Sequence, residues 1–446
     1  MNMPDKQRSG GKPAWSNLAL VLLSAGLGLV IIEIGLRLTC RPDIRLVTGR
    51  GFLKPDPDAD YDQTENFPRQ AITSFDGKSR YWQWTNELGC FDNPFQEGPY
   101  ALLVGDSFTF GGNNLQDTWG GLLEANCGQR ILKCGVAGYG TRQELLKAEK
   151  IMARAGTPRL IVVGHYVNDI DDDYLVGGGV TVVDGWPVTR KKIIDYQTGK
   201  TAVKTEAAIR LELSLRGKYG EIIECPSNTS WQLFKCWLYR NSMIYHRLKL
   251  PLRNLLTRIP MVKRVLVQSR ALASDYQPLA VELSPDLPWV KKAWKAHLAN
   301  LKAFQKLAAR RHAKLLIVLI PHRDQLYPFL TNTSQTRRDN VNQAHEALRK
   351  FLAREGIDHM DLLDSFRQYE AAPPDSACGK DCAAGSAPTL YYKHDIHWSP
   401  LGQRLAGLLV ARRILEQRLL DSPDRQRRLL AIDQALADWK QPPARP

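Results

Sequence analysis

Short apolar runs alternate with amphipathic stretches over most of the chain. Five runs have the length and composition of buried strands: 101–104, 130–134, 159–164, 314–320 and 356–363. Three stretches between them have the spacing of amphipathic helices: 117–126, 142–156 and 334–356. Buried strands that alternate with helices predict an α/β fold, in which a parallel sheet is covered by helices on both faces.

The alternation is interrupted in two places. Residues 39–98 contain Pro, Asp and aromatic residues but few periodic stretches, and we expect them to form a lead-in segment to a main domain at 99–446. Within that domain, residues 170–290 include a glycine-rich, hairpin-like piece at 176–196, followed by an irregular basic stretch. We interpret 170–290 as an insertion that lies over one edge of the sheet.

The most apolar part of the chain lies close to its start. Residues 15–36 contain one charged residue, Glu33, near their end, and they are long enough to cross a bilayer as a helix. Three basic residues lie within the first 12 positions, so the positive-inside rule favours a cytoplasmic N-terminus. The run is long for a cleaved signal peptide. We therefore expect a cytoplasmic segment at 1–14, one transmembrane signal anchor at 15–38 in a bacterial inner membrane, and the rest of the chain in the periplasm.

Composition and charge narrow the class of protein. The chain has 446 residues, of which 43% are hydrophobic and 24% are charged, values typical of a folded globular protein. Its formal charge is +15, but the basic residues are spread over expected helices such as 291–314 and 411–428, which indicates solvated helix faces. Because no nucleic-acid recognition motif accompanies the charge, we expect no nucleic-acid partner.

Eight cysteines fit an exported chain, because disulfides form in oxidising compartments. Three pairs are close together in the sequence and are candidates for disulfides: Cys127–Cys134, Cys225–Cys236 and Cys378–Cys382. Reduced, buried thiols are the alternative. No pair has the CxxC spacing typical of zinc sites, and we expect neither a metal nor a cofactor.

A serine stands at the abrupt end of the first buried strand. Ser107 follows "ALLVGD", where a packing role has little use for a hydroxyl, but serine is a poor nucleophile without a neighbouring base. His397 has suitable surroundings, because Asp395 lies two residues before it and a marked helix start follows, with Ser399 as N-cap and Pro400 at the first helical position. These residues predict a catalytic triad of Ser107 as nucleophile, His397 as general base and Asp395 as the acid that orients the imidazole.

Four blocks of the sequence resemble those of the SGNH, or GDSL-type, esterases and acyltransferases. They are "GDSFTFG" (105–111), "KCGVAGYGT" (133–141), "VVGHYVNDIDD" (162–172) and "HDIHWS" (394–399). The resemblance implies the SGNH hydrolase fold, a flavodoxin-like three-layer α/β/α sandwich. It also implies an oxyanion hole formed by the backbone N–H groups of Ser107 and Gly138 and the side-chain amide of Asn168.

The chain departs from the family pattern at two positions. Tyr166 stands where the family usually has glycine, two residues before the asparagine. The acid and base are spaced Asp-x-His-Trp instead of Asp-x-x-His, and His394 stands where the acid is expected. This spacing resembles the polysaccharide O-acetyltransferases of the alginate-acetylation type, which carry the motif upstream of their serine. The membrane-anchored branch that includes those proteins is therefore the nearest resemblance.

A further motif of that branch is similar to "LIVLIPHRDQLY" at 316–327. It follows a predicted strand, so the resemblance implies that His322 or Arg323 contacts the substrate. An ordinary polar loop at a strand end is the alternative.

The acidic run at 169–173 invites a calcium interpretation, since carboxylates are calcium ligands. It lacks the spacing of an EF-hand loop. We therefore expect a solvated loop in which Asp169 supports Asn168.

These features predict a serine-dependent acyl-ester hydrolase that acts on an ester-modified carbohydrate in the cell envelope. An O-acetyltransferase that modifies an envelope or exported polysaccharide with the same Ser-His-Asp machinery is the alternative, and a non-catalytic carbohydrate-binding or scaffold protein is a second one. The expected partners are an acyl-ester or polysaccharide substrate, the inner membrane through residues 15–38, and a membrane protein that donates the acyl group.

Overall fold

A computed structural model of the protein describes residues 14–39, 50–76, 79–175, 179–210, 213, 238, 242–245, 278–327, 334–370, 389–392 and 395–440. The chain divides into two compact units: Met1–Ile44 with Glu206–Tyr276, and Arg45–Thr205 with Gln277–Pro446. The second unit contains all the described residues for which chemistry is predicted.

Helix α1 (Ala14–Thr39) belongs to the first unit and covers the segment in which a membrane span is predicted. Large apolar side chains along it are exposed, from Leu20 at 70% to Leu38 at 82%. Over the part of the chain that the structure describes, no helix is both long enough and apolar enough to cross a membrane, and the predicted span at 15–38 is not confirmed.

A five-stranded parallel sheet forms the centre of the second unit. Its strands are β5 (Ala101–Gly105), β6 (Ile131–Lys133), β7 (Leu160–His165), β12 (Lys314–Leu319) and β13 (His359–Asp361). They are arranged in the order β13-β12-β7-β5-β6, which is the flavodoxin-like order, so the α/β prediction and its five strands are confirmed. The strand order reverses between β5 and β7, and open α/β sheets bind ligands at the carboxyl ends of the strands at such a point.

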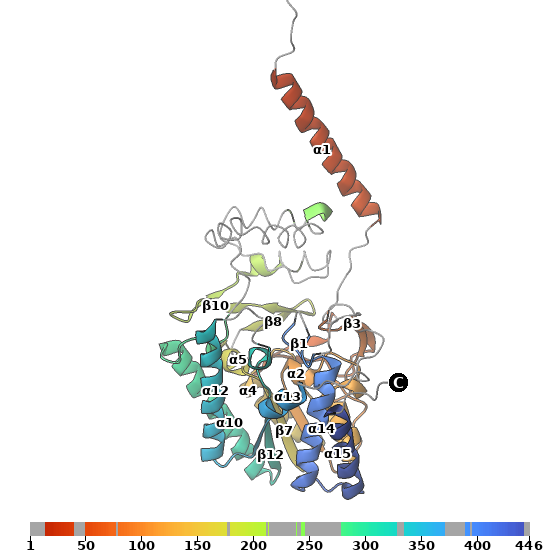
Figure 1. The fold of residues 1–446 in the computed structure, drawn as a ribbon, viewed down its shortest axis with the longest axis vertical. Helices are drawn as coiled ribbons and strands as arrows, with labels where there is room; N and C mark the ends of the chain where they lie inside the picture. Colours follow the sequence, from red (N-terminus) through yellow and green to blue (C-terminus); the bar gives the residue numbers. More distant parts are fainter. Residues whose placement is uncertain are drawn as a thin grey trace, which may run out of the picture. The chain divides into compact units, whose positions relative to one another are not determined.

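Helices cover both faces of this sheet, because the strands carry apolar side chains on both faces. In β5, Ala101 and Leu103 pack into one apolar core and Leu102 and Val104 into the other, because neighbouring side chains of a strand point to opposite faces. One face is covered by α3 (Trp119–Cys127), α13 (Leu363–Glu370), α14 (Pro400–Glu416) and α15 (Arg425–Lys440). The other face is covered by α4 (Thr141–Ala155), α10 (Pro288–Arg310) and α12 (Gln335–Arg354). Figure 1 shows α10 and α12 on one side of β7 and β12, and α14 and α15 on the other.

The predicted start of α14 is confirmed, but its predicted continuation is wrong. Ser399 caps the helix through its hydroxyl, and Pro400 is its first residue, as predicted. The helix expected over 411–428 is wrong, because α14 ends at Glu416 and α15 starts at Arg425. Arg418 and Asp424 lie between these two helices and adopt positive φ angles, which a continuous helix does not allow.

The lead-in segment forms two hairpins. One joins β1 (Leu53–Asp56) to β2 (Asp60–Gln63), and the other joins β3 (Gln70–Thr73) to β4 (Arg80–Gln83). Their aromatic side chains share a third apolar core with Phe110 and Tyr139, which lie in the segments that follow β5 and β6. The lead-in therefore packs directly against the loops at the carboxyl edge of the sheet.

The region at 170–290 also starts with regular structure. Strands β8 (Val180–Val183) and β9 (Trp186–Thr189) form the predicted hairpin, and β10 (Lys191–Asp195) pairs with β11 (Lys200–Val203). Asp184 and Gly185 join β8 to β9 with positive φ angles, as a two-residue type I′ turn requires. Short helices complete the second unit: α2 (Ser107–Phe110), η1 (Leu115–Asp117), α5 (Asp169–Leu175), η2 (Ala280–Glu282) and α11 (Arg323–Leu326).

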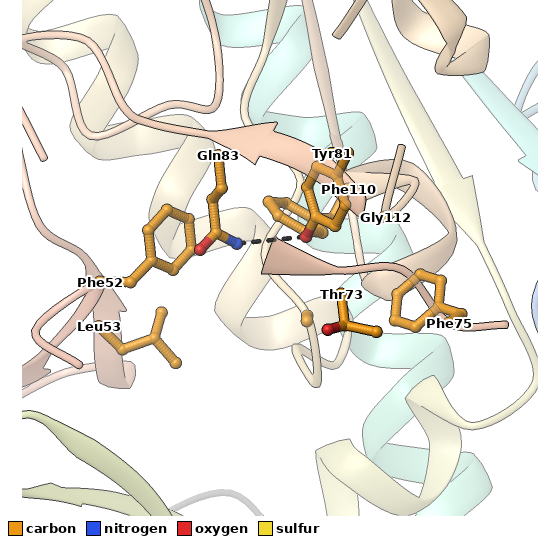
Figure 2. Close-up of a pocket in the computed structure, with 9 residues that line it drawn as sticks. Phe52, Leu53, Thr73, Phe75, Tyr81, Gln83, Phe110 and Gly112 are labelled. Atoms are coloured by element: carbon orange, nitrogen blue, oxygen red, sulfur yellow. Dashed lines mark hydrogen bonds between the residues drawn. The ribbon is translucent and has the colours of Figure 1, made fainter. Parts of the chain in front are cut away.

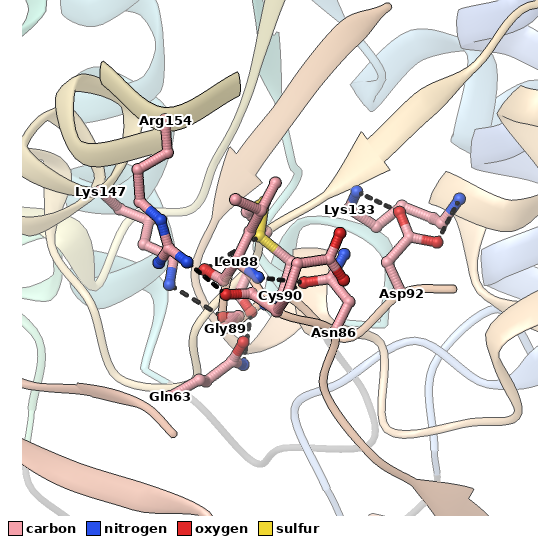
Figure 3. The surroundings of a disulfide bond; sticks show 12 residues. Gln63, Asn86, Leu88, Gly89, Cys90, Asp92, Lys133, Lys147 and Arg154 are labelled. Carbon is pink, nitrogen blue, oxygen red and sulfur yellow. Dashed lines mark hydrogen bonds and ion pairs between the residues drawn. A yellow bond between two sulfur atoms is a disulfide. The ribbon is translucent and has the colours of Figure 1, made fainter. Parts of the chain in front are cut away.

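A disulfide ties the lead-in segment to the sheet. Cys90 is bonded to Cys134, the residue after β6, in the surroundings that Figure 3 shows. The predicted pair Cys127–Cys134 is wrong, because Cys127 is a free, buried thiol in the core on one face of the sheet and Cys134 lies in the core on the other face. The candidate pairs Cys225–Cys236 and Cys378–Cys382 lie outside the described residues.

Candidate active site

Ser107 is held at the carboxyl end of β5 by a turn that only glycine permits. Gly105 has φ +156°, and a Cβ atom there would lie 2.0 Å from Thr109 Oγ1 and 2.7 Å from the carbonyl oxygen of Gly164. Helix α2 then starts at Ser107, and the Asp106 carboxylate caps it by accepting the Phe108 N–H at 2.8 Å. The tight turn and the cap fix the serine hydroxyl at the edge of the sheet.

Three side chains predicted as a triad lie in one hydrogen-bonded chain. His397 Nε2 lies 2.7 Å from Ser107 Oγ, and His397 Nδ1 lies 2.5 Å from Asp395 Oδ1. With Nδ1 donating to the carboxylate, Nε2 is left to accept the serine proton. Burial alone would raise the pKa of Asp395, but the hydrogen bond from His397 and its charge hold that pKa below the usual value. Asp395 is thus suited to remain an anion beside the imidazole.

Two aromatic rings hold the imidazole in place. Phe75 stacks on His397 with ring centres 3.8 Å apart and planes 10° from parallel, and Phe108 lies 5.0 Å from it at a tilt. Phe75 comes from the lead-in segment, directly beyond β3. Sequence reasoning missed it, because no motif or periodicity distinguishes this phenylalanine from other aromatic residues of that segment.

Gly138 and Asn168, the two predicted oxyanion donors besides Ser107, lie in the segments that follow β6 and β7, the strands on either side of β5. Gly138 follows β6 with φ +79°, and Asn168 lies between β7 and α5. The Asn168 side-chain amide donates to Asp172 Oδ2 at 3.0 Å, while its Oδ1 is buried without a partner among the described residues. The oxyanion role of Gly138 and Asn168 stays a prediction, and the contact with Asp172 is a feature that the sequence did not indicate.

The acidic run beside Asn168 is not a solvated loop, and that prediction is wrong. Its residues form α5, in which Asp169, Asp171 and Asp173 are buried. Asp173 Oδ2 lies 2.9 Å from Nδ1 of the buried His297, and Asp171 accepts the Ala280 N–H at 3.0 Å. The carboxylates are buried because α10 and η2 supply these partners.

Asp106 and Glu144 extend this buried acidic group towards the serine. Burial raises the pKa of Asp106 to about 6, although the Phe108 N–H and the charge of His397 act to lower it. Burial also raises the pKa of Glu144 well above its usual range, and the charges of Asp106 and Asp173 raise it further. Neither oxygen of Glu144 has a hydrogen-bond partner among the described residues, so this carboxyl is suited to be neutral.

Of the two predicted substrate contacts, the structure buries one. His322 is 5% exposed, its Nδ1 accepts the Asp324 N–H at 3.2 Å, and burial lowers its pKa to about 4. Arg323 donates to the backbone oxygen of Asp395 at 3.0 Å, so it supports the loop that carries the acid. Contact of either side chain with substrate stays a prediction.

Among the residues that the structure describes, one group has donor atoms close enough to share a metal ion. Glu282, His322 and Asp324 each offer an atom within 4.8 Å of the others. The Arg337 guanidinium already pairs with the Glu282 carboxylate, and the only described contact of His322 Nδ1 is with a backbone N–H. The positive charge beside the Glu282 carboxylate is thus the Arg337 side chain. The cluster of Glu282, His322 and Asp324 gives no reason to assign a metal ion.

The sequence of the second unit matches a known family over its C-terminal part. Residues 286–435 match the family described as "SGNH hydrolase-like domain, acetyltransferase AlgX". Residues 286–435 of this chain are therefore similar to an SGNH hydrolase-like domain. The resemblance to the SGNH family and its alginate-acetylation branch is thereby confirmed, and the predicted enzyme class, an esterase or O-acyltransferase, is the one that fits this family. The matched residues include Asp395 and His397, whereas Ser107, Gly138 and Asn168 precede them.

A curated relative and solved structures are also similar to the chain. The "Probable alginate O-acetylase AlgJ" of Pseudomonas aeruginosa is 33% identical over 129 residues, which are 28% of this chain and 28% of that protein. A GDSL-like lipase from Bacteroides thetaiotaomicron is 10% identical over 71% of this chain and 88% of its own, with a TM-score of 0.31. A catalytic mutant of an acetylxylan esterase from Geobacillus stearothermophilus is 13% identical over 74% and 99%, also with a TM-score of 0.31. The chain thus spans little more than a quarter of the length of this curated relative.

Proposed function

We propose that the protein is a serine-dependent acyl-ester hydrolase of the SGNH type. The observation that carries the proposal is the continuous chain from Ser107 Oγ to His397 Nε2 at 2.7 Å and from His397 Nδ1 to Asp395 Oδ1 at 2.5 Å. A non-catalytic carbohydrate-binding protein has no need for a serine hydroxyl held against an imidazole that a carboxylate orients. The arrangement therefore favours catalysis over binding alone.

Each side chain has a defined step in this reaction. Ser107 Oγ attacks the ester carbonyl carbon while His397 Nε2 takes its proton, and Asp395 stabilises the imidazolium that results. The carbonyl oxygen becomes an oxyanion, which the N–H groups of Ser107, Gly138 and Asn168 would bind. His397 then protonates the alcohol oxygen as the ester bond breaks, which leaves an acyl-serine. A water molecule resolves this acyl-serine by the same steps in reverse, releasing a carboxylic acid.

Transfer of the acyl group to a sugar hydroxyl is the second candidate. It differs in one step, because a hydroxyl of a polysaccharide takes the place of water and a new ester forms. The match to an acetyltransferase family and the similarity to an alginate O-acetylase support this alternative. A polysaccharide ester is accordingly the proposed substrate class, and a protein that donates the acyl group is a proposed partner for the transfer.

Export of the chain forms a further part of the proposal. The Cys90–Cys134 bond supports it, because disulfides persist in oxidising compartments such as the periplasm. The exposed apolar side chains of α1 support association with the cell envelope. An export-dependent reporter fused after Pro446 should be active, whereas a reporter that needs the cytosol should be silent. The reverse pattern would contradict the proposed location.

Turnover of p-nitrophenyl acetate tests the chemistry, and an added oligosaccharide tests the acceptor. The wild-type protein should release p-nitrophenol, and Ser107→Ala should not. Ser334→Ala is a matched control, because Ser334 is an exposed helix cap outside the site. Hydrolysis is favoured if free acetate accounts for all turnover, and transfer is favoured if acetyl groups appear on the oligosaccharide. Equal activity of wild type and Ser107→Ala would refute the proposal.

A further inference from the structure

One buried histidine contacts both elements that flank the loop of Asn168. His297 lies in α10 and is 0% exposed. Its Nε2 lies 2.9 Å from Nε2 of His165, the last residue of β7, and its Nδ1 lies 2.9 Å from Oδ2 of Asp173 in α5. These three residues form a bridge between the strand before the predicted oxyanion donor and the helix after it.

The position of α5 determines where the Asn168 amide points. The side-chain amide of Asn168 donates to Asp172 Oδ2 at 3.0 Å. The backbone oxygen of Asn168 accepts the N–H groups of Asp171 and Asp172 at 2.9 and 3.0 Å. Only residues 166–168 connect β7 to α5, so the loop is too short to absorb a displacement of the helix. A shift of α5 against β7 would therefore carry the amide with it.

The contacts of His297 suit a fixed bridge between the two elements. Two imidazole nitrogens at 2.9 Å require that one ring donates and the other accepts, so the bond orients both rings. Burial lowers the pKa of His165 well below its usual range, which keeps this ring neutral. Asp173 also accepts the Arg142 N–H at 2.8 Å through Oδ1, so α4 supports the same carboxylate. The bridge thus has a partner at each nitrogen of His297, and all three of its members are buried.

We propose that His297 is a positioning residue for the oxyanion hole, which holds α5 against β7 so that the Asn168 amide meets the developing negative charge. The proposal rests on the proposed function, in which Asn168 is one of three oxyanion donors. The described polar contacts of the His297 ring are with His165, Asp173 and Thr141. None of these is a triad or oxyanion residue, so His297 would act through Asn168 alone. The effect should be large, because misplacing a catalytic group by about 1 Å can cost about 100-fold in rate.

Turnover of p-nitrophenyl acetate by His297 variants tests the bridge. His297→Ala removes both contacts and should lower kcat about 10- to 100-fold while KM stays within about twofold, because an oxyanion donor acts in the transition state and not in substrate binding. His297→Asn can keep the contact with Asp173, and His297→Gln can keep the contact with His165, so each should lose less than His297→Ala. An unchanged kcat in His297→Ala, or a loss that appears in KM alone, would overturn the proposal.

The loss should disappear in a protein that lacks the Asn168 amide. The double variant of Asn168→Ala with His297→Ala should be no slower than Asn168→Ala, since the effects of residues that act as a unit do not add. A loss by the same factor in both backgrounds would overturn the proposal. His297→Asn and His297→Gln go through the same cycle, which keeps the test decisive where His297→Ala does not fold.

Two buried polar side chains outside the bridge supply matched controls. His345 is 7% exposed and pairs at 2.8 Å with Asp361 of β13, which is two strands away from β7 in the sheet. Gln83 is 1% exposed and donates to the Tyr81 hydroxyl at 3.4 Å in the apolar cavity that Figure 2 shows, which no triad or predicted oxyanion residue lines. His345→Asn and Gln83→Met should each change kcat by the same factor with and without the Asn168 amide. Coupling in either control as strong as in the bridge variants would overturn the proposal.

A spectroscopic measurement separates this proposal from the proposed function. In protein labelled with ¹⁵N-asparagine, the side-chain amide signal of Asn168 is the one that Asn168→Ala lacks. It should move or broaden in His297→Ala and stay in place in His345→Asn, whether or not the protein turns over an ester. A moved signal in a protein without esterase activity would refute the proposed function and leave the positioning of the amide standing. An unmoved signal would overturn the positioning even if Ser107 is active.

Discussion

Removing the Cys90–Cys134 bond should strongly destabilise the second unit. The bond closes a loop with a sequence separation of 44 residues between the lead-in segment and the sheet, and both cysteines are buried. The perturbation is the double substitution Cys90→Ala with Cys134→Ala. Cys127→Ala is the matched control, because it removes a buried sulfur that is in no disulfide.

The length of the closed loop determines how much the free energy of unfolding should fall. The chain-entropy relation yields about 4 kcal/mol at 25 °C for a separation of 44 residues, because the unfolded chain regains the freedom that the bond removes. The free energy of unfolding should therefore fall by about 4 kcal/mol in the double variant. With a urea dependence of about 3 kcal/mol per molar, the midpoint should move down by about 1.3 M.

Urea unfolding followed by tryptophan fluorescence, without reductant, measures this change. Cys127→Ala should lose much less, and adding dithiothreitol should lower the wild-type midpoint towards that of the double variant. A midpoint shift below about 0.3 M in the double variant, or free thiols at both positions in the oxidised wild-type protein, would refute the reasoning.

Four further substitutions test the site and its buried acids. Asp395→Asn should lower kcat about 10⁴-fold by allowing the wrong histidine tautomer, measured as turnover of p-nitrophenyl acetate; a loss below tenfold would contradict the triad. Asn168→Ala should lower kcat about 10²- to 10³-fold with little change in KM, Asp172→Ala should lower it less, and the double variant should be no slower than Asn168→Ala, since Asp172 acts through Asn168. Burial raises the pKa of Asp171 to about 7 from 3.8, so the folded state binds its proton more tightly and this carboxyl costs stability progressively as pH rises from about 4 to about 7. Asp171→Asn should therefore be more stable relative to wild type at pH 8 than at pH 5 in urea unfolding, and an equal difference at both pH values would contradict the assignment.

The sheet could be predicted because parallel strands that are buried on both faces are unbroken apolar runs. All side chains of β5 and β7 are buried, and the sequence marks both strands clearly. Local signals were equally reliable where one residue determines the geometry. Ser399 and Pro400 start α14, and the hairpin-like piece at 176–196 contains the β8–β9 hairpin.

Features that depend on distant contacts could not be predicted. Cys134 was paired with the nearby Cys127, but the two lie on opposite faces of the sheet, and nothing in the sequence indicates that Cys90 comes close. The acids of α5 resemble a solvated surface in sequence, and their burial depends on partners such as His297, which is 124 residues from Asp173.

The candidate site also contains residues that the sequence predicts and residues that it does not. Ser107, His397 and Asp395 were identified from their blocks, and the structure brings all three together. Phe75 was missed, because stacking on an imidazole leaves no trace in the sequence of a short hairpin.

Labelling with a fluorophosphonate tests the central claim most directly, because this probe reacts with a serine that is activated by a neighbouring base. Peptide mass mapping of the labelled wild-type protein should place the adduct on Ser107, and the hydroxyl's activation by His397 should make labelling of His397→Ala much slower. Ser107→Ala should take up no label while unfolding at the same urea concentration as wild type. An adduct on another serine, or undiminished labelling of Ser107→Ala, would contradict the account.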